Sequence, residues 1–210
     1  MSKAEFVAQH TQVMAPPLVP EVQLHLAHEA VPIWQKTEEE LGEMGLPPPF
    51  WAFAWAGGQA LARHVLDHSE IVRNKTVLDL ASGSGLVGIA AMKAGAASVL
   101  AADIDVFACA AIKLNAKLNG VEVTATGADL LATASGDFDI ILVGDLFYEQ
   151  ALARRCYDFL KSAKAVGLIG DPGRTYLPKD KLVQIASYAV PVSRELEDSE
   201  IKHTTVWRLI

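Results

Sequence analysis

The sequence has few of the features that mark a secreted or membrane-bound protein. It has only two cysteines, Cys109 and Cys156, both within helical patterns of apolar residues, where a small buried thiol is the usual interpretation. We therefore expect no disulfide framework, as is typical of a reducing cytosol. No run approaches the roughly 20 apolar residues of a membrane span. The first ten residues, MSKAEFVAQH, lack a signal-peptide core and the Arg-rich character of a transit peptide, so we expect a cytoplasmic protein.

Positive charge is also scarce. Lysine and arginine together number 18 against 25 aspartates and glutamates, which gives a net charge of −7. A broad surface for phosphates would have to be built against this average charge, so we expect neither a nucleic acid nor a membrane as partner. A chain of 210 residues with 51% hydrophobic content is long enough for one substantial core. We expect a single compact domain that acts as a monomer.

Prolines punctuate the first fifty residues, and each is unfavourable inside a helix. They are Pro16, Pro17, Pro20, Pro32, Pro47, Pro48 and Pro49. Residues 1–56 are therefore predicted to form an arm or lid packed on a core of residues 57–210. Within the arm, Val22, Leu24 and Leu26 alternate with polar residues, which predicts a short strand.

Beyond the arm, helical and strand periodicities alternate, and this order is typical of parallel strands joined by right-handed crossovers. Strands are predicted near 76–80, 97–102, 121–125, 138–144, 165–170, 183–192 and 203–209. Helices are predicted near 57–65, 86–94, 106–119 and 149–163. The last two strands are separated by charged residues without a helix, which indicates an antiparallel hairpin. The pattern predicts an α/β fold with a mostly parallel seven-stranded sheet.

A glycine-rich loop follows the first of these parallel strands. In VLDLASGSGLVG, a buried strand comes directly before Gly83 and Gly85, and a helix follows, so the backbone can approach a ligand and the helix offers free amide donors. With Gly88 these glycines also satisfy the dinucleotide pattern G-x-G-x-x-G. Asp79, inside the strand, disfavours a pyrophosphate ligand because both are negative. It can instead order the loop and face a cationic amino-acid group, which favours S-adenosylmethionine.

Further acidic residues stand at the ends of the next strands. Asp103, roughly 20 residues beyond the loop, can accept the hydroxyls of a ribose. Asp105 competes for this role, or else caps the helix that begins near Val106. Asp129 is placed to accept an adenine amino group, or else is an ordinary loop or cap residue. The predicted cofactor-binding residues are Asp79, Ala81, Ser82, Gly83, Gly85, Asp103, Ile104, Asp129 and Trp55.

The fourth strand of the predicted sheet leads into the residues that we expect to be catalytic. FDIILVGDLFYEQ places Asp145 and Tyr148 at a carboxyl end, where parallel sheets have their sites. We predict that Asp145 orients an acceptor amine and holds charge as it develops, with Tyr148 as hydrogen-bond partner and wall. The alternatives are a helix N-cap for Asp145 and simple packing for Tyr148. After the fifth strand, Asp171 and Arg174 of GDPGR either position a substrate or form a turn.

Aromatic residues cluster immediately before the first predicted helix of the core. The segment PFWAFAWAGG contains Phe50, Trp51, Phe53 and Trp55. Aromatic faces attract a sulfonium or an ammonium through the ring quadrupole. Such a cluster is also typical of a core beneath a lid, so of these residues only Trp55 is assigned to the cofactor.

Several of these segments together resemble one methyltransferase family. The segments are FWAFAWAGGQALARHVLD, VLDLASGSG, LAADID, GDLFYE and GDPGR. They are similar to those of the electron-transfer flavoprotein beta-subunit lysine methyltransferases. The resemblance covers most of residues 21–208 and implies a Rossmann-like class I fold with helices on both faces of the sheet. It also implies an Asp-x-x-Tyr active-site motif at Asp145 to Tyr148, and a lysine of that beta subunit as the methyl acceptor.

One residue departs from the family pattern. Ala81 stands at the first loop position, where a glycine is usual. Without a transit peptide, the chain is interpreted as a bacterial, cytoplasmic member of the family. Two alternatives remain open: an N-methyltransferase for small amines such as a nicotinamide-like compound, and a noncatalytic module that binds a nucleotide.

Overall fold

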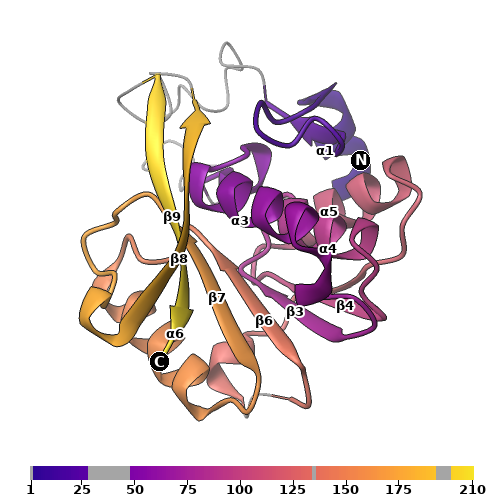
Figure 1. The fold of residues 1–210 in the computed structure, drawn as a ribbon. Helices are drawn as coiled ribbons and strands as arrows, with labels where there is room; N and C mark the ends of the chain where they lie inside the picture. The colour runs from indigo at the N-terminus through magenta and orange to yellow at the C-terminus, as the bar shows by residue number, and fades with distance from the viewer. Residues whose placement is uncertain (1, 28–47, 134–135, 193–199) are drawn as a thin grey trace.

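A seven-stranded sheet forms the centre of the molecule (Figure 1). The computed structural model describes residues 2–27, 48–133, 136–192 and 200–210. The strands are β3 (Thr76–Leu80), β4 (Ser98–Ala102), β5 (Thr124–Thr126), β6 (Ile140–Gly144), β7 (Val166–Asp171), β8 (Leu182–Pro191) and β9 (Ile201–Leu209). Their order in the sheet is β5-β4-β3-β6-β7-β9-β8.

Parallel pairing joins β5, β4, β3, β6 and β7, whereas β9 is antiparallel to both β7 and β8. The predicted mostly parallel sheet with an antiparallel C-terminal pair is therefore confirmed. The prediction that no helix separates β8 from β9 falls on residues 193–199, outside the described residues. The third strand begins later than predicted, at Thr124, because residues 121–123 lie outside the sheet.

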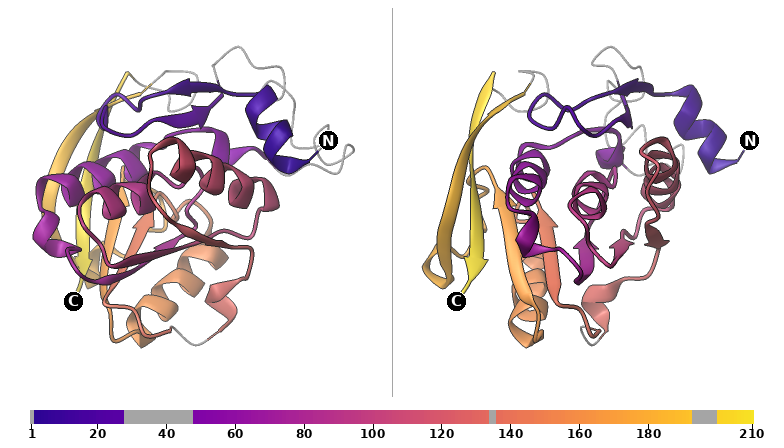
Figure 2. Two further views of the ribbon diagram at one scale, coloured as in Figure 1. Left: turned by 90° about the vertical axis from the view of Figure 1, so that its right-hand side faces the viewer. Right: turned by 45° about the vertical axis from the view of Figure 1, so that its right-hand side comes forward.

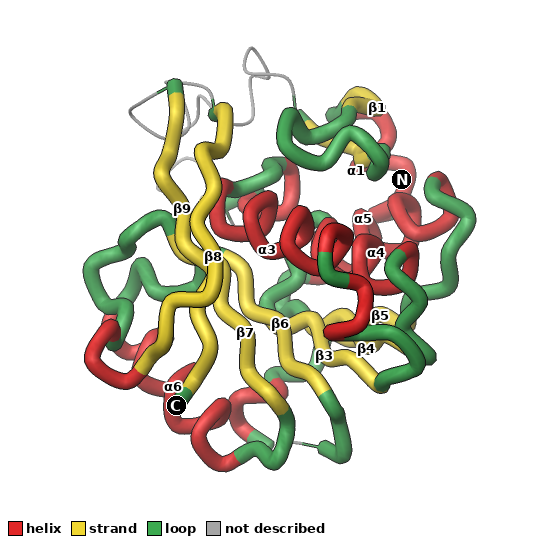
Figure 3. Tube along the Cα trace, viewed as in Figure 1, coloured by secondary structure: helices red, strands yellow, loops and turns green. Residues whose placement is uncertain are grey.

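Helices cover both faces of the sheet, as expected. On one face lie α3 (Ala56–Asp67), α4 (Leu86–Lys93) and α5 (Val106–Leu118), and on the other lies α6 (Gln150–Ser162) (Figures 2 and 3). Short 3-10 helices are η1 (Phe50–Ala52), η2 (Ser69–Ile71), η3 (Leu130–Ala132) and η4 (Lys179–Lys181). The β6 strand reads as a continuous apolar run because it is covered on both sides.

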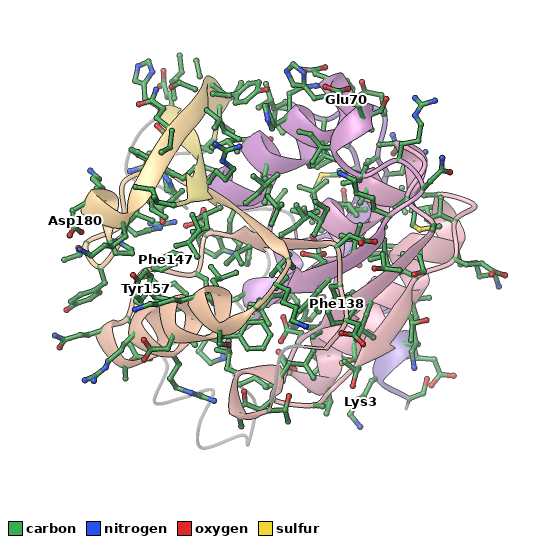
Figure 4. The ribbon with its side chains drawn as sticks, turned by 60° about the horizontal axis from the view of Figure 1, so that its bottom comes forward. Lys3, Glu70, Phe138, Phe147, Tyr157 and Asp180 are labelled. Atoms are coloured by element: carbon green, nitrogen blue, oxygen red, sulfur yellow. The ribbon has the colours of Figure 1, made fainter. Side chains whose placement is uncertain are left out.

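Two hydrophobic clusters fill the layers on either side of the sheet. One includes Leu61 of α3 and Ile89 of α4, both fully buried. The other includes Phe159 of α6 and Phe147, which points into the layer between the sheet and α6 (Figure 4). Phe147 lies between Asp145 and Tyr148 in the chain. Its burial therefore anchors the segment that carries the two predicted catalytic residues.

The N-terminal arm packs on the same core. It contains α1 (Lys3–Gln9) and an antiparallel pair, β1 (Gln12–Met14) with β2 (Leu24–Leu26). The predicted strand is thus present as β2, whereas α1 and β1 were not predicted. Val19, Val22 and Leu24 are fully buried in the larger cluster. Pro32 and Pro47 of the arm lie outside the described residues.

The two cysteines differ in their surroundings. Both are free thiols, and Cys156 is fully buried in α6, as predicted. Cys109 is partly exposed, so the prediction that both are buried is wrong for this residue. Cys109 lies on α5, and its Sγ donates a hydrogen bond to the Asp103 carbonyl. Among the residues that the structure describes, no helix combines the length and apolar character needed to cross a bilayer.

Candidate active site

The glycine loop connects β3 to α4, and three of its residues have positive φ angles. Ala81, Gly83 and Gly85 have φ angles of +52°, +56° and +84°. This left-handed region is accessible to glycine without strain but is unfavourable for alanine, which explains why a glycine is usual at position 81. Gly85 is also the N-cap residue of α4. The loop therefore lies between a buried strand and a helix, as predicted, but the amides of Gly83, Gly85 and Gly88 donate hydrogen bonds within the protein.

Asp79 of β3 fixes the conformation of this loop through two hydrogen bonds. Its Oδ2 accepts hydrogen bonds from the Ser82 hydroxyl at 2.5 Å and from the Gly88 amide in the first turn of α4 at 2.8 Å. Burial raises the pKa of this carboxyl from 3.8 to about 6, although both hydrogen bonds act against the rise. The ordering role predicted for Asp79 is confirmed. That Asp79 also faces a cationic ligand group stays a prediction.

The two aspartates after β4 have different tasks. Asp103 accepts the Gly83 amide on Oδ2 and the Asp105 amide on Oδ1, each at 2.9 Å. Asp105 is the N-cap of α5 and accepts from the Phe107 amide at 2.7 Å. Burial raises the pKa of both carboxyls. Asp103 therefore lies against the loop, and Asp105 has the capping role that was its alternative. The neighbouring Ile104 is 72% exposed, so its apolar side chain is free to cover a ligand.

Asp129 and Trp55 make their hydrogen bonds with residues outside the glycine loop. Asp129 is exposed and pairs with Arg155 of α6 at 2.6 Å, an ion pair of the kind that contributes little to stability. The Trp55 indole donates to the Phe50 carbonyl at 2.9 Å. A Cβ placed on Gly83 would lie 3.9 Å from the Trp51 Cα, so the aromatic segment passes beside the loop. Binding of a cofactor by Asp129 and Trp55 stays a prediction.

Asn115 connects the loop to the N-terminal arm, and sequence reasoning missed it. This fully buried residue of α5 donates to the Ser84 carbonyl at 2.8 Å and accepts from the His25 amide at 2.7 Å. A buried asparagine must satisfy its amide, and it does so on two segments that are far apart in the sequence. The only signal in the sequence was a polar residue on an otherwise apolar helix face.

Asp145 follows β6 in a left-handed conformation with φ of +59°. Its Oδ2 accepts the Gly57 amide at 2.7 Å, and its Oδ1 pairs with Arg174 Nε at 2.5 Å. The N-cap of α6 is Glu149, so the helix-cap alternative for Asp145 is wrong for the helix that follows it. Instead, the carboxylate satisfies an amide in the first turn of α3, a hydrogen bond favoured by charge and by the helix dipole.

Close backbone contacts between glycines bring α3 to this position. A Cβ on Gly57 would lie 2.3 Å from the Gly170 carbonyl oxygen, and one on Gly144 would lie 2.9 Å from the Gly58 Cα. Only glycine permits such an approach. These contacts were not predicted, although the sequence carries a signal in the doublet Gly57-Gly58 and in the Gly-Asp ends shared by β6 and β7.

The GDPGR segment after β7 is a turn that delivers an arginine to the site. Asp171 Oδ1 accepts the amides of Gly173 at 2.6 Å and Arg174 at 2.7 Å. Burial raises the pKa of Asp171 from 3.8 to about 6. Its Oδ2 has no hydrogen-bond partner among the described residues. The turn therefore fixes the backbone of Arg174, whose side chain reaches Asp145.

Tyr148 lies three residues beyond Asp145 and is within electrostatic reach of both Asp145 and Asp103. Its side chain is 48% exposed, and its ring centroid lies 5.9 Å from that of Phe50. Partial burial, followed by the charges of Asp103, Glu149 and Asp145, raises the pKa of its hydroxyl. Tyr148 is therefore a neutral hydrogen-bond donor within the electrostatic reach of both halves of the site.

The carboxylates at this end of the sheet favour a positively charged ligand. Asp79, Asp103, Asp145 and Asp171 all stand at carboxyl ends of parallel strands, where ligands of such sheets bind. The Asp103 carboxylate has lone pairs left for the hydroxyls of a nucleoside, and the negative charge of the four carboxylates fits a sulfonium or an ammonium. A pyrophosphate fits this charge poorly.

Comparisons with known proteins agree with this geometry. The family model described as Ribosomal protein L11 methyltransferase (PrmA) matches residues 60–161. The crystal structure of the ribosomal protein L11 methylase from Lactobacillus delbrueckii subsp. bulgaricus is similar with a TM-score of 0.54 and 24% identity, over 75% of this chain and 81% of that chain. Fold and site define a class I methyltransferase that uses S-adenosyl-L-methionine.

Relatives that match nearly the whole chain are more specific. The electron transfer flavoprotein beta subunit lysine methyltransferase of Rattus norvegicus is 37% identical over 96% of this chain and 82% of its own length. That of Xenopus laevis is 38% identical over 96% of this chain and 85% of its own length. The chain belongs to the electron transfer flavoprotein beta subunit lysine methyltransferase family. The resemblance noted from its motifs is thereby confirmed.

Proposed function

We propose that the protein transfers methyl groups from S-adenosyl-L-methionine to lysine side chains of the electron transfer flavoprotein beta subunit. One observation carries the proposal: relatives named for this activity are 37% and 38% identical over 96% of the chain. We also propose that it acts in the cytoplasm as a monomer. The net charge of −7 disfavours a nucleic acid as the methyl acceptor.

The residues around the glycine loop would hold the methyl donor. Asp103 keeps lone pairs for ribose hydroxyls while it accepts the Gly83 amide. The exposed Ile104 would cover the adenine, and Asp79 would remain beneath the loop as its support. When bound, S-adenosylmethionine supplies an electrophilic methyl group, whose bond to sulfur breaks as a bond to an acceptor nitrogen forms.

The acceptor amine must first lose a proton. A lysine amine has a reference pKa of about 10.4, so freeing its lone pair near neutral pH costs on the order of 4–5 kcal/mol. Tyr148 is partly exposed, so a proton from the ammonium can pass to solvent at this rim. Asp145 would hold the amine by its remaining lone pairs and stabilise the positive charge that returns to nitrogen as the new bond forms.

The fixed positions of the site residues would contribute most of the acceleration of methyl transfer. Asp145 is fixed by two partners, Gly57 and Arg174, and it therefore needs little reorganisation when an amine arrives. The rings of Phe50 and Tyr148 would line the path of the lysine, since aromatic faces stabilise ammonium groups.

Transfer of labelled methyl groups tests the proposal. The protein is incubated with methyl-labelled S-adenosylmethionine and, in parallel, with purified beta subunit, a whole-cell lysate, or a panel of small heteroaromatic and aliphatic amines. We expect label in the beta subunit, and in the lysate a band of the same mass. Label confined to small amines would overturn the proposed acceptor. If no acceptor receives label, the protein is a noncatalytic module instead.

A further inference from the structure

A groove between α1 and α5 lies outside the site described above. Its volume is about 390 Å³, and its apolar floor includes Val106, Ala110 and Leu114 of α5. Three lysines line it from the two helices: Lys3, Lys113 and Lys117. Figure 2 shows α1 beside α5 at the edge of the molecule, and Lys3 projects from the end of α1 in Figure 4. The groove thus combines an apolar floor with a cationic rim.

This concentration of positive charge is unusual for the chain. The net charge is −7, yet the groove is lined by three lysines and by no acidic residue. Among the described residues, no carboxylate lies within ion-pair distance of any of the three. Lys113 and Lys117 are also four residues apart on one helix, where like charges repel. These lysines therefore contribute no ion pair within the described fold and remain available to an external anion.

The walls of the groove are held in place by packing. The Phe6 ring of α1 lies 5.0 Å from the Phe107 ring of α5, measured between centroids. Ser2 and Glu5 form a capping box that fixes the start of α1. The groove is therefore a feature of the folded molecule, with both of its helices anchored.

One end of the groove lies close to Asp103. Cys109, which lines it, donates a hydrogen bond from Sγ to the Asp103 carbonyl at 3.3 Å. From Val106 to Lys117 the helix extends about 16 Å at 1.5 Å per residue. That length matches roughly five residues of extended peptide. A peptide lying along the groove would thus end near the residues that hold the methyl donor.

We propose that this α1–α5 groove docks an acidic segment of the protein substrate, with apolar side chains on its floor and carboxylates against Lys3, Lys113 and Lys117. The inference rests on the proposed function and names the surface that would select the substrate. Electrostatic complementarity of this kind raises the association rate and specificity of a complex. It also weakens as ionic strength rises, because the lysines are exposed to solvent.

Charge reversal tests the groove. Lys113→Glu combined with Lys117→Glu is compared with Lys161→Glu, which changes an exposed lysine of α6 on the opposite face of the sheet. We expect the double variant to raise the KM for the beta subunit at least tenfold and to bind S-adenosylhomocysteine as tightly as the wild type. The Lys161→Glu control should leave KM within twofold. An unchanged KM in the double variant would overturn the groove proposal alone.

Cys109 provides a second readout without any substitution. It is the partly exposed thiol of the pair, because Cys156 is fully buried. We expect saturating beta subunit to slow the alkylation of Cys109 by N-ethylmaleimide at least fivefold. Unchanged alkylation in a complex that transfers methyl groups would overturn the groove proposal, as would equal protection by a long-chain carboxylate. If the wild type transfers no methyl group to the beta subunit, the groove proposal and the proposed function are both overturned.

Discussion

Replacement of Asp145 tests how the site holds its acceptor. Asp145→Asn keeps a residue type that tolerates the left-handed conformation at φ of +59° and keeps an oxygen for the Gly57 amide. It removes the negative charge, which faces Arg174 and which, in our proposal, also faces the acceptor amine. Asp145→Ala removes the charge, the acceptor oxygen and the conformational tolerance together. The two variants therefore separate the role of the charge from that of the fold.

The expected magnitudes follow from the contacts. Hydrogen bonds to charged groups contribute about 1.5–3 kcal/mol and neutral ones about 0.5–1.5 kcal/mol, so Asp145→Asn should destabilise the protein by about 1–2 kcal/mol. Asp145→Ala adds a left-handed alanine, at about 1–2 kcal/mol, and a lost helix-capping bond, at about 1 kcal/mol. Loss of a fixed charge that stabilises the transition state should lower the methyl-transfer rate by about 10²- to 10³-fold in both variants.

The assay combines kcat/KM for methyl transfer to the beta subunit with calorimetric unfolding at the same pH. Asp158→Asn, an exposed residue of α6, provides the matched control and should change neither quantity. A stable Asp145→Asn variant with a kcat/KM within about threefold of the wild type would refute the reasoning. In that case the carboxylate serves only to cap α3, and the acceptor is oriented by other groups.

Three further predictions concern the loop and the strand ends. Ala81→Gly should relieve the strain of the left-handed alanine at φ of +52° and raise the melting temperature by about 1–4 °C, and an unchanged or lower value in calorimetry would contradict this assignment. Asp103→Asn should weaken S-adenosylhomocysteine binding by roughly tenfold or more, whereas Asp105→Asn should leave it unchanged. If titration calorimetry shows the larger loss of affinity in Asp105→Asn, then Asp105 rather than Asp103 binds the ribose. Because burial raises the pKa of Asp171 from 3.8 to about 6, the wild type should lose stability as pH rises from about 4 to above 6. In denaturant titrations, the unfolding free energy of Asp171→Asn relative to that of the wild type should therefore increase across that interval. If this difference does not increase with pH, the buried carboxylate does not destabilise the folded protein.

Strands and helices of the core were predictable because their apolar patterns are strong. The β6 strand, Ile140–Gly144, is a continuous apolar run, and α5 begins at the aspartate that caps it. β5 was placed too early because Val121 and Val123 alternate with polar residues as a strand would, although they lie before it. α1 was missed although Ser2 and Glu5 carry the capping-box signal, because a seven-residue helix leaves little periodicity to read.

The site was predictable where its contacts are local and unpredictable where they are not. Asp79, Ser82 and Gly88 lie within ten residues of one another, so the support of the loop could be inferred from spacing. Asp145 instead meets Gly57 and Arg174, which are 88 and 29 residues away in the chain. Only the assembled fold shows that its carboxylate joins the start of α3 to the turn after β7.

Intact-mass measurement of the beta subunit tests the central claim most directly. Purified beta subunit is incubated with S-adenosylmethionine and either the wild-type protein or Asp145→Asn, and its mass is followed with time. We expect the wild type to raise the mass in whole methyl steps that map to lysine side chains, and Asp145→Asn to do so at a small fraction of the rate. A beta subunit whose mass never changes, under conditions where the protein binds S-adenosylhomocysteine, would contradict the account.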